Sequence, residues 1–183
     1  MFGLEQDEID YSAGYSPKIP VFTEREERLP RRLWTEILPN LWLGGTANND
    51  VVPEVGLRVM SSTPRPISKK DFDTVITLYA WANPCNWLVK EIRYGYYDSP
   101  TMEKIDLDTI TQLVEVAYAD WKSGKKVLIR CQAGLNRSSL VLALVLIKDG
   151  YDSNEAISLM RDKRSPLCLF NKVFEAYIRG LDS

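Results

Sequence analysis

The stretch VLIRCQAGLNRS at residues 127–138 decides the fold. It begins with an apolar run typical of a buried strand, passes through a short loop that holds Gly134, and continues into a helical pattern over residues 137–148. Backbone N–H groups in such a loop point inward and form a nest for an anion, and the N-terminus of the next helix adds partial positive charge. The stretch therefore predicts a phosphate-binding loop between a strand and a helix.

Two side chains of this loop are suited to chemistry. Cys131 ends the strand, and the positive potential around it favours the thiolate, which is the nucleophilic form. Arg137 can hold two phosphate oxygens with its planar fork. The competing interpretation of Cys131 is a small buried hydrophobic residue. The loop residues between them are expected to act through backbone N–H groups; they are Gln132, Ala133, Gly134, Leu135 and Asn136.

This stretch resembles the signature loop of the cysteine-dependent protein tyrosine phosphatases, and more closely that of their dual-specificity branch. The pattern of that family, H-C-x-x-G-x-x-R-[ST], is matched at Cys131, Gly134, Arg137 and Ser138. The chain departs from it at Arg130, where the family has a histidine that orders the loop. Arginine keeps a positive charge there but cannot copy the hydrogen bonds of an imidazole. Because residues 35–45 also resemble the opening of dual-specificity domains, the resemblance covers residues 34–179.

The resemblance implies a phosphoprotein phosphatase that works through a phosphocysteine intermediate, with no cofactor and no metal. In the family, the serine after the arginine assists departure of the thiolate, which points to Ser138. The family's general acid is an aspartate about thirty residues before the cysteine, in a loop after a strand. Asp98 lies 33 positions before Cys131 and is the expected acid. Asp106 and Asp108 are alternatives, but they stand where a helix N-cap is expected.

Further candidates follow the strand expected at residues 73–79, whose carboxyl end should face the ligand. Trp81 and Trp87, together with Arg130, are candidates for a substrate pocket, and core packing is the alternative for the aromatic side chains. Cys85 lies in the same loop, so a Cys85–Cys131 disulfide is an alternative to a buried free thiol, since some relatives protect the catalytic cysteine in this way. Cys168 is interpreted as structural.

Composition excludes several functions. The 183 residues include no histidine, which rules out a Ser-His-Asp triad, a Cys-His pair and a histidine-ligated metal. A net charge of −2 lacks the excess of positive charge that is typical of nucleic-acid-binding proteins. Three widely spaced cysteines favour a reducing compartment, and the longest apolar run, Leu140 to Ile147, is too short for a membrane span. We expect an intracellular, cytoplasmic protein whose partners are a phosphorylated protein substrate and a phosphate or sulfate ion in the loop; its oligomeric state stays open.

The expected fold is α/β, with a central mixed sheet of about five strands flanked by helices. Residues 1–32 are interpreted as a partly ordered N-terminal extension and residues 33–183 as the phosphatase domain. Strands are predicted at two positions within 34–45, around a Pro39-Asn40 turn, and at 73–79, 91–96 and 127–129. Helices are predicted at 105–121, 137–148, 154–163 and 172–179, with Ser153 as an N-cap.

Other functions stay open at this point. A phosphate-binding pseudoenzyme is supported only by Arg130. A phosphatase for non-protein substrates, such as phosphoinositides, RNA 5′ ends or nucleotides, is a second alternative, although the loop lacks the lysines found in inositol-phosphate relatives. Rhodanese-like sulfurtransferase or arsenate-reductase chemistry is a third. Those proteins lack the upstream aspartate loop, so the role of Asp98 discriminates between the classes.

Overall fold

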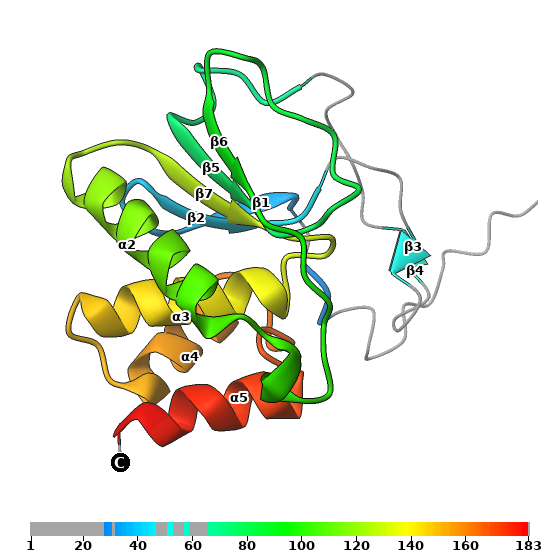
Figure 1. Cartoon of the computed structure of the whole chain (residues 1–183), viewed down its shortest axis with the longest axis vertical. Coiled ribbons are helices and arrows are strands. Elements are labelled where there is room, and N and C mark those ends of the chain that lie inside the picture. The colour runs from blue at the N-terminus through cyan, green and yellow to red at the C-terminus, as the bar shows by residue number, and fades with distance from the viewer. Residues whose placement is uncertain (1–27, 31, 47–50, 53–56, 59–65, 183) are drawn as a thin grey trace, which may run out of the picture.

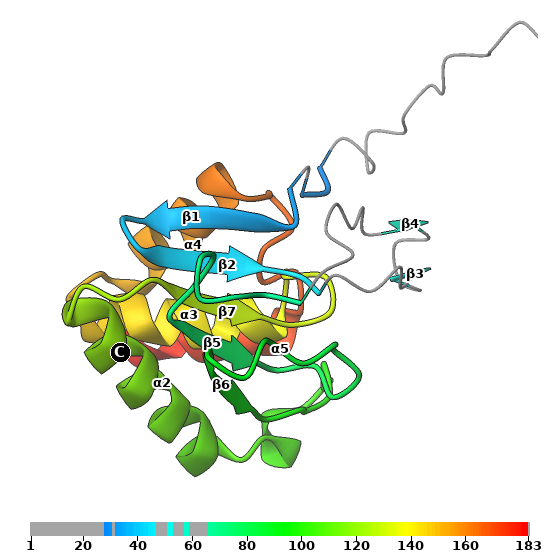
Figure 2. The ribbon, with the colours of Figure 1, turned by 90° about the horizontal axis from the view of Figure 1, so that it is seen from above.

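The computed structural model describes residues 28–30, 32–46, 51–52, 57–58 and 66–182. At its centre is a five-stranded sheet in the order β1-β2-β7-β5-β6, which Figure 2 shows from above. The first pair is antiparallel and the other pairs are parallel. The strands are β1 (Trp34–Leu38), β2 (Leu41–Gly44), β5 (Thr74–Thr77), β6 (Lys90–Arg93) and β7 (Val127–Arg130). The predicted α/β class with a mixed sheet of five strands is confirmed.

Strand β7 occupies the middle of the sheet. All four of its residues are buried, and it pairs in parallel with β2 on one side and β5 on the other. Carboxyl ends of parallel strands meet at one edge of a sheet, which is where ligands bind in open α/β folds. Position 131 is therefore brought to the centre of that edge.

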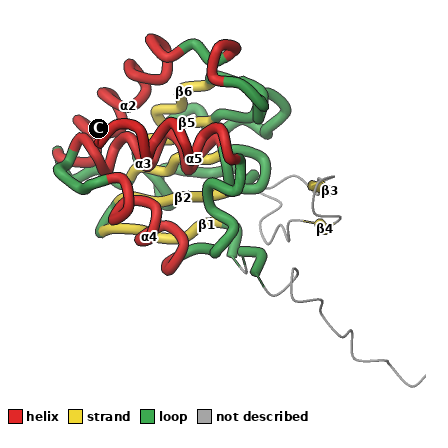
Figure 3. The backbone as a smooth tube through the Cα atoms, turned by 90° about the horizontal axis from the view of Figure 1, so that it is seen from below, coloured by secondary structure: helices red, strands yellow, loops and turns green. Residues whose placement is uncertain are grey.

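The four α-helices of the described residues lie together on one face of the sheet, as Figures 1 and 3 show from two sides. They are α2 (Leu107–Lys122), α3 (Arg137–Lys148), α4 (Ser153–Lys163) and α5 (Lys172–Arg179). The predicted helices 137–148 and 172–179 are confirmed to the residue. The predicted Ser153 cap is wrong, because Asp152 accepts the Glu155 N–H in a capping box and the helix begins one residue earlier.

The two faces of the sheet bury different clusters. Side chains alternate along β7, so Val127 and Ile129 join the core under the helices, whereas Leu128 joins a smaller cluster on the opposite face. Phe72 lies in that smaller cluster, and its ring contacts Trp34 and Trp42 edge-on. This alternation decides on which face each residue near the loop lies.

The remaining described elements are short. Two 3-10 turns, η1 (Met102–Lys104) and η2 (Gly180–Asp182), flank α2 and α5, and β3 (Val51–Val52) pairs with β4 (Leu57–Arg58) in a separate two-stranded sheet. Most of the predicted extension, residues 1–27, lies outside the described residues. Leu29 nonetheless packs against the main core. The division at residue 33 stays a prediction. Among the described residues, no helix combines the length and the apolar character that a membrane span requires.

Candidate active site

The loop of residues 131–136 joins β7 to α3 at the carboxyl edge of the sheet (Figure 1). Its start is tied to β2, because the Cys131 N–H donates to the Gly44 carbonyl at 3.1 Å. Gly134 has a φ of +70°. A Cβ atom at that position would collide with the Gly44 backbone and with the Arg164 guanidinium. Only glycine fits there, which explains its place in the motif.

All four carbonyls from residue 132 to residue 135 are hydrogen-bonded on the outside of the loop. Thr46 N–H donates to the Gln132 carbonyl, and Leu169 N–H donates to the Leu135 carbonyl. The carbonyls of Ala133 and Gly134 both accept from Arg164. The C=O and N–H groups of one peptide unit point in opposite directions. The N–H groups of residues 133–136 are therefore directed inward, where an anion nest needs them.

The thiol of Cys131 lies inside this loop and is 3% exposed. Its sulfur is 3.2 Å from the Ser138 hydroxyl, and the Gly134 N–H donates to it at 3.3 Å. Burial opposes ionisation, but the positive charge of Arg137 and the hydrogen bonds of Ser138 and Gly134 outweigh it and lower the pKa of Cys131. The surroundings thus favour the nucleophilic thiolate.

Arg137 is held by residues that follow β5 and β6. Its Nη1 donates to the Tyr96 carbonyl at 3.0 Å, and its guanidinium lies 5.3 Å from the centre of the Tyr79 ring. The Tyr96 hydroxyl donates in return to the Arg137 carbonyl. Within the described residues, the buried Nε of Arg137 has no hydrogen-bond partner. An arginine fixed along one edge with an unpaired Nε is prepared to donate to an incoming oxyanion.

Asp98 lines the same small pocket as the thiol. The pocket is lined by Asp98, Cys131, Gln132, Ala133, Leu135, Asn136, Arg137 and Phe170. One carboxylate oxygen of Asp98 accepts from Asn136 Nδ2 at 2.6 Å, and the other accepts from Asn171 Nδ2 at 2.5 Å. Two amides from different elements therefore fix the carboxylate at the pocket. Asp106 is instead the N-cap of α2, as its position in the sequence indicated.

The interpretation of Asn136 as a purely backbone contributor is wrong. Its side chain donates to Asp98 and also accepts the Asn171 N–H at 2.9 Å. Asn171 in turn caps α5 by accepting the N–H groups of Val173 and Phe174. Asn171 directly precedes the predicted helix 172–179, and no local pattern brings it near Asp98, so this contact could not be found from the sequence.

Arg130 does not lie in the pocket, contrary to the pocket role considered for it. It is 2% exposed and alternates with Cys131 along the strand, so its side chain points to the opposite face. There it donates to the Thr77 hydroxyl and the Asn83 carbonyl, and it pairs with Glu91 at 3.0 Å. Arg130 therefore replaces the family's histidine in sequence but not in its contacts with the loop.

The two tryptophans considered for the pocket also do not line it. Trp81 is 78% exposed and Trp87 is 86% exposed, and neither contributes to the pocket wall. Phe170 provides the aromatic wall in their place, from the segment between α4 and α5. That segment showed no sequence pattern that would have marked it.

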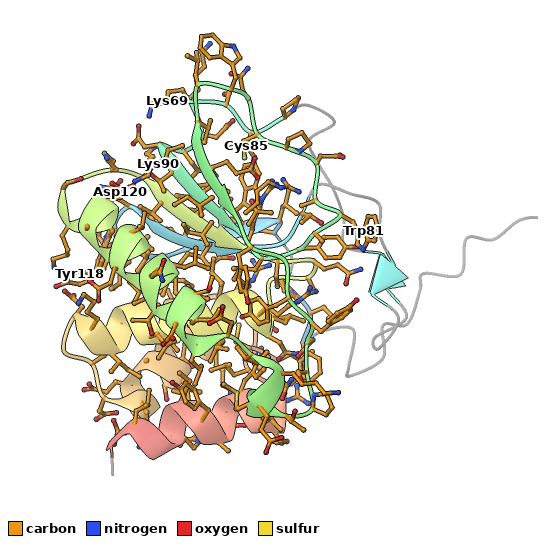
Figure 4. The ribbon with its side chains drawn as sticks, viewed as in Figure 1. Lys69, Trp81, Cys85, Lys90, Tyr118 and Asp120 are labelled. Atoms are coloured by element: carbon orange, nitrogen blue, oxygen red, sulfur yellow. The ribbon has the colours of Figure 1, made fainter. Side chains whose placement is uncertain are left out.

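Cys85 is a free thiol away from Cys131. It packs against the smaller cluster on the face opposite the helices, where Figure 4 places it, and it contacts Arg130. Burial raises the pKa of Cys85 to about 12. The disulfide alternative is therefore contradicted. Cys168 is fully buried, as its structural interpretation requires. Among the described residues, no group of acids and cysteines is arranged to hold a metal ion.

Comparison with known proteins places this site among phosphatases. The family model described as the dual specificity phosphatase catalytic domain matches residues 58–179. Protein 123R of Invertebrate iridescent virus 6, which carries the name of a tyrosine phosphatase, is 28% identical over 154 residues, covering 81% of this chain and 94% of that protein.

Solved structures agree on the fold. The crystal structure of human DUSP28 has a TM-score of 0.61 at 16% identity, covering 85% of this chain and 99% of that one. OH1 from the Orf virus, described as a tyrosine phosphatase with triple substrate specificity, has a TM-score of 0.58 at 15% identity, covering 84% of this chain and 88% of that one.

Proposed function

The chain belongs to the dual specificity phosphatase family and is a cysteine-dependent phosphatase; from that premise we propose that it hydrolyses phosphoproteins through a phosphocysteine intermediate. Phosphotyrosine is the first substrate of this proposal, with phosphoserine and phosphothreonine as further substrates. The observation that carries it is a buried thiol with a lowered pKa, directed into one pocket with Arg137 and Asp98.

In this proposal each group has one role. The Cys131 thiolate attacks phosphorus and forms the S–P bond while the ester P–O bond breaks. Asp98 gives its proton to the leaving oxygen, and Ser138 assists the thiolate's departure in the second step. Arg137 and the inward N–H groups of residues 133–136 stabilise the charge on the phosphoryl oxygens. Water, activated by the Asp98 carboxylate, then cleaves the S–P bond and releases phosphate.

The covalent step is tested with Cys131→Ser. The variant should lose hydrolysis of an aryl phosphate by about 10³-fold or more, because a serine hydroxyl is not ionised there, and should still bind inorganic phosphate. Cys85→Ser is the matched control, since that thiol lies on the other face of the sheet, and it should retain activity. Turnover near the wild-type rate in Cys131→Ser would exclude a phosphocysteine intermediate.

The substrate class is tested with a panel at matched concentrations. It compares phosphotyrosine, phosphoserine and phosphothreonine peptides with phosphoinositides, nucleotides and 5′-triphosphate RNA. The proposal expects phosphotyrosine peptide to have the highest kcat/KM. A higher value for a non-protein substrate would favour that alternative, and phosphate binding without turnover of any substrate would favour a pseudoenzyme.

A further inference from the structure

Arg164, at the C-terminal end of α4, is a buried cation directly behind the catalytic loop. It is 8% exposed and is the C-cap residue of that helix. Its Nε donates to the Gly134 carbonyl at 2.7 Å, and its Nη2 donates to the Ala133 carbonyl at 3.1 Å. Nη1 donates to the Thr35 hydroxyl at 3.0 Å and to the Arg32 carbonyl at 3.2 Å. One guanidinium therefore joins α4, the catalytic loop and the start of β1.

The two loop bonds of Arg164 fix consecutive peptide units. Holding the Ala133 carbonyl outward turns the Gly134 N–H inward, and that N–H donates to the Cys131 sulfur at 3.3 Å. Holding the Gly134 carbonyl outward turns the Leu135 N–H inward in the same way. A planar fork suits this task, because its N–H groups diverge at fixed angles and can reach two neighbouring carbonyls together.

The charge of Arg164 is not neutralised by a carboxylate among the described residues. Its guanidinium donates to backbone carbonyls and to one hydroxyl. The titratable groups that interact with it are the thiols of Cys131 and Cys168. Burial raises the pKa of Cys168, so that thiol is neutral. Burial also lowers the pKa of Arg164 to about 10, which still leaves it charged at neutral pH. Of these two thiols, Cys131 is the one whose pKa is lowered, so its thiolate is the anion that the charge of Arg164 can stabilise.

We propose that Arg164 is a positioning residue, which holds the loop in its phosphate-binding conformation and adds a second positive charge near the thiolate. The proposal rests on the proposed phosphatase function and deepens it. It also accounts for a loop that keeps its inward N–H groups without the histidine of the family motif. Arg130, the residue that stands in the histidine's place, makes its contacts on the other face of the sheet.

The test uses Arg164→Met, Arg164→Lys and the matched control Arg130→Met, which removes another buried arginine, one that faces away from the loop. The rate of iodoacetate inactivation against pH reports the pKa of Cys131, and protection by inorganic phosphate reports the affinity of the loop. Neither measurement needs turnover. If the wild type hydrolyses no phosphoprotein, the proposed function fails, but the pH dependence of inactivation and the protection by phosphate can still be measured. Failure of the proposed function is therefore distinguishable from failure of the role proposed for Arg164.

For Arg164→Met we expect the thiol pKa to rise by about one unit and the affinity for phosphate to fall about tenfold. Arg164→Lys should keep a lowered thiol pKa but bind phosphate more weakly than the wild type, because one ammonium cannot span both carbonyls in the geometry of the fork. Arg130→Met should leave both readouts unchanged. If Arg164→Met does not fold, the phosphate affinity of Arg164→Lys alone tests the proposal. Wild-type thiol pKa and wild-type phosphate affinity in every folded Arg164 variant would overturn the proposal.

Discussion

Asp98 is the side chain whose chemistry can be tested most directly. Its carboxylate lines the same pocket as the thiol, and its two oxygens accept from Asn136 and Asn171. A carboxamide has nearly the same size, but it has no proton to give to the leaving oxygen, and it can accept only one of these two hydrogen bonds. Asp98→Asn should lower kcat on phosphotyrosine peptide by about 10²–10³-fold. The loss should be smaller for an aryl phosphate whose leaving group needs no proton.

The control for Asp98 is Asp106→Asn, which changes an exposed carboxylate that caps α2. It should alter helix stability slightly and turnover hardly at all. Equal losses on both kinds of substrate in Asp98→Asn, or the same kinetic defect in Asp106→Asn, would assign the general acid elsewhere.

The ion pair of Arg130 and Glu91 joins β7 to β6 on the face away from the helices. Burial works against ionisation of Glu91, but hydrogen bonds from Thr77, Cys85 and Arg130 lower the pKa of Glu91, so the pair is charged at neutral pH. Arg130→Met leaves this carboxylate without its buried partner. We expect the free energy of unfolding to fall by about 3–5 kcal/mol, measured with denaturant at pH 7.

The double variant Glu91→Gln with Arg130→Met removes both charges and should lose less stability than the two single losses together. This outcome separates a structural ion pair from a residue that acts on the active site. An unchanged free energy of unfolding in Arg130→Met, with a raised thiol pKa, would instead indicate that Arg130 assists the thiolate.

Acid stability of the folded chain should depend on Asp120, which is 7% exposed on α2. Burial opposes its ionisation, but hydrogen bonds from Lys125, Lys90 and Thr74 outweigh it and lower the pKa of Asp120 from 3.8 to about 2. Figure 4 shows Asp120 on the side of α2 nearest Lys90. Because the folded pKa lies below the unfolded value, this stabilisation is complete above pH 3.8 and is lost as the pH falls towards 2.

Asp120→Asn should therefore lower the free energy of unfolding by about 1–3 kcal/mol at pH 7. Its deficit relative to the wild type should shrink as the pH falls below 3.8. Asp149→Asn is the control, because the Lys122–Asp149 bridge is more exposed and should contribute much less to the free energy of unfolding. A deficit that stays constant down to pH 2 would contradict the assignment.

Most of the fold could be predicted because its signals are local. The apolar run of β7, the helical period of α3 and the turn at Asn40, which has a φ of +66°, depend on neighbours in the chain. The positions of Cys131, Gly134 and Arg137 also followed from local pattern, since the loop, the strand before it and the helix after it are contiguous. The local sequence of residues 127–148 therefore determines both their secondary structure and the anion nest.

Tertiary structure decided the rest, because the remaining contacts join residues far apart in the sequence. Arg164 and Asn171 reach the loop only after α4 and α5 pack on the helical face, and no local pattern in the sequence predicts these contacts. The pocket position predicted for Arg130 was wrong for a related reason. Arg130 precedes the nucleophile in the sequence, but the alternation of side chains along the strand directs Arg130 to the opposite face. Its partners on that face come from β5, β6 and the loop between them. Spacing along the chain fixes which residues can meet within one element, whereas packing of the elements fixes which residues meet across the fold.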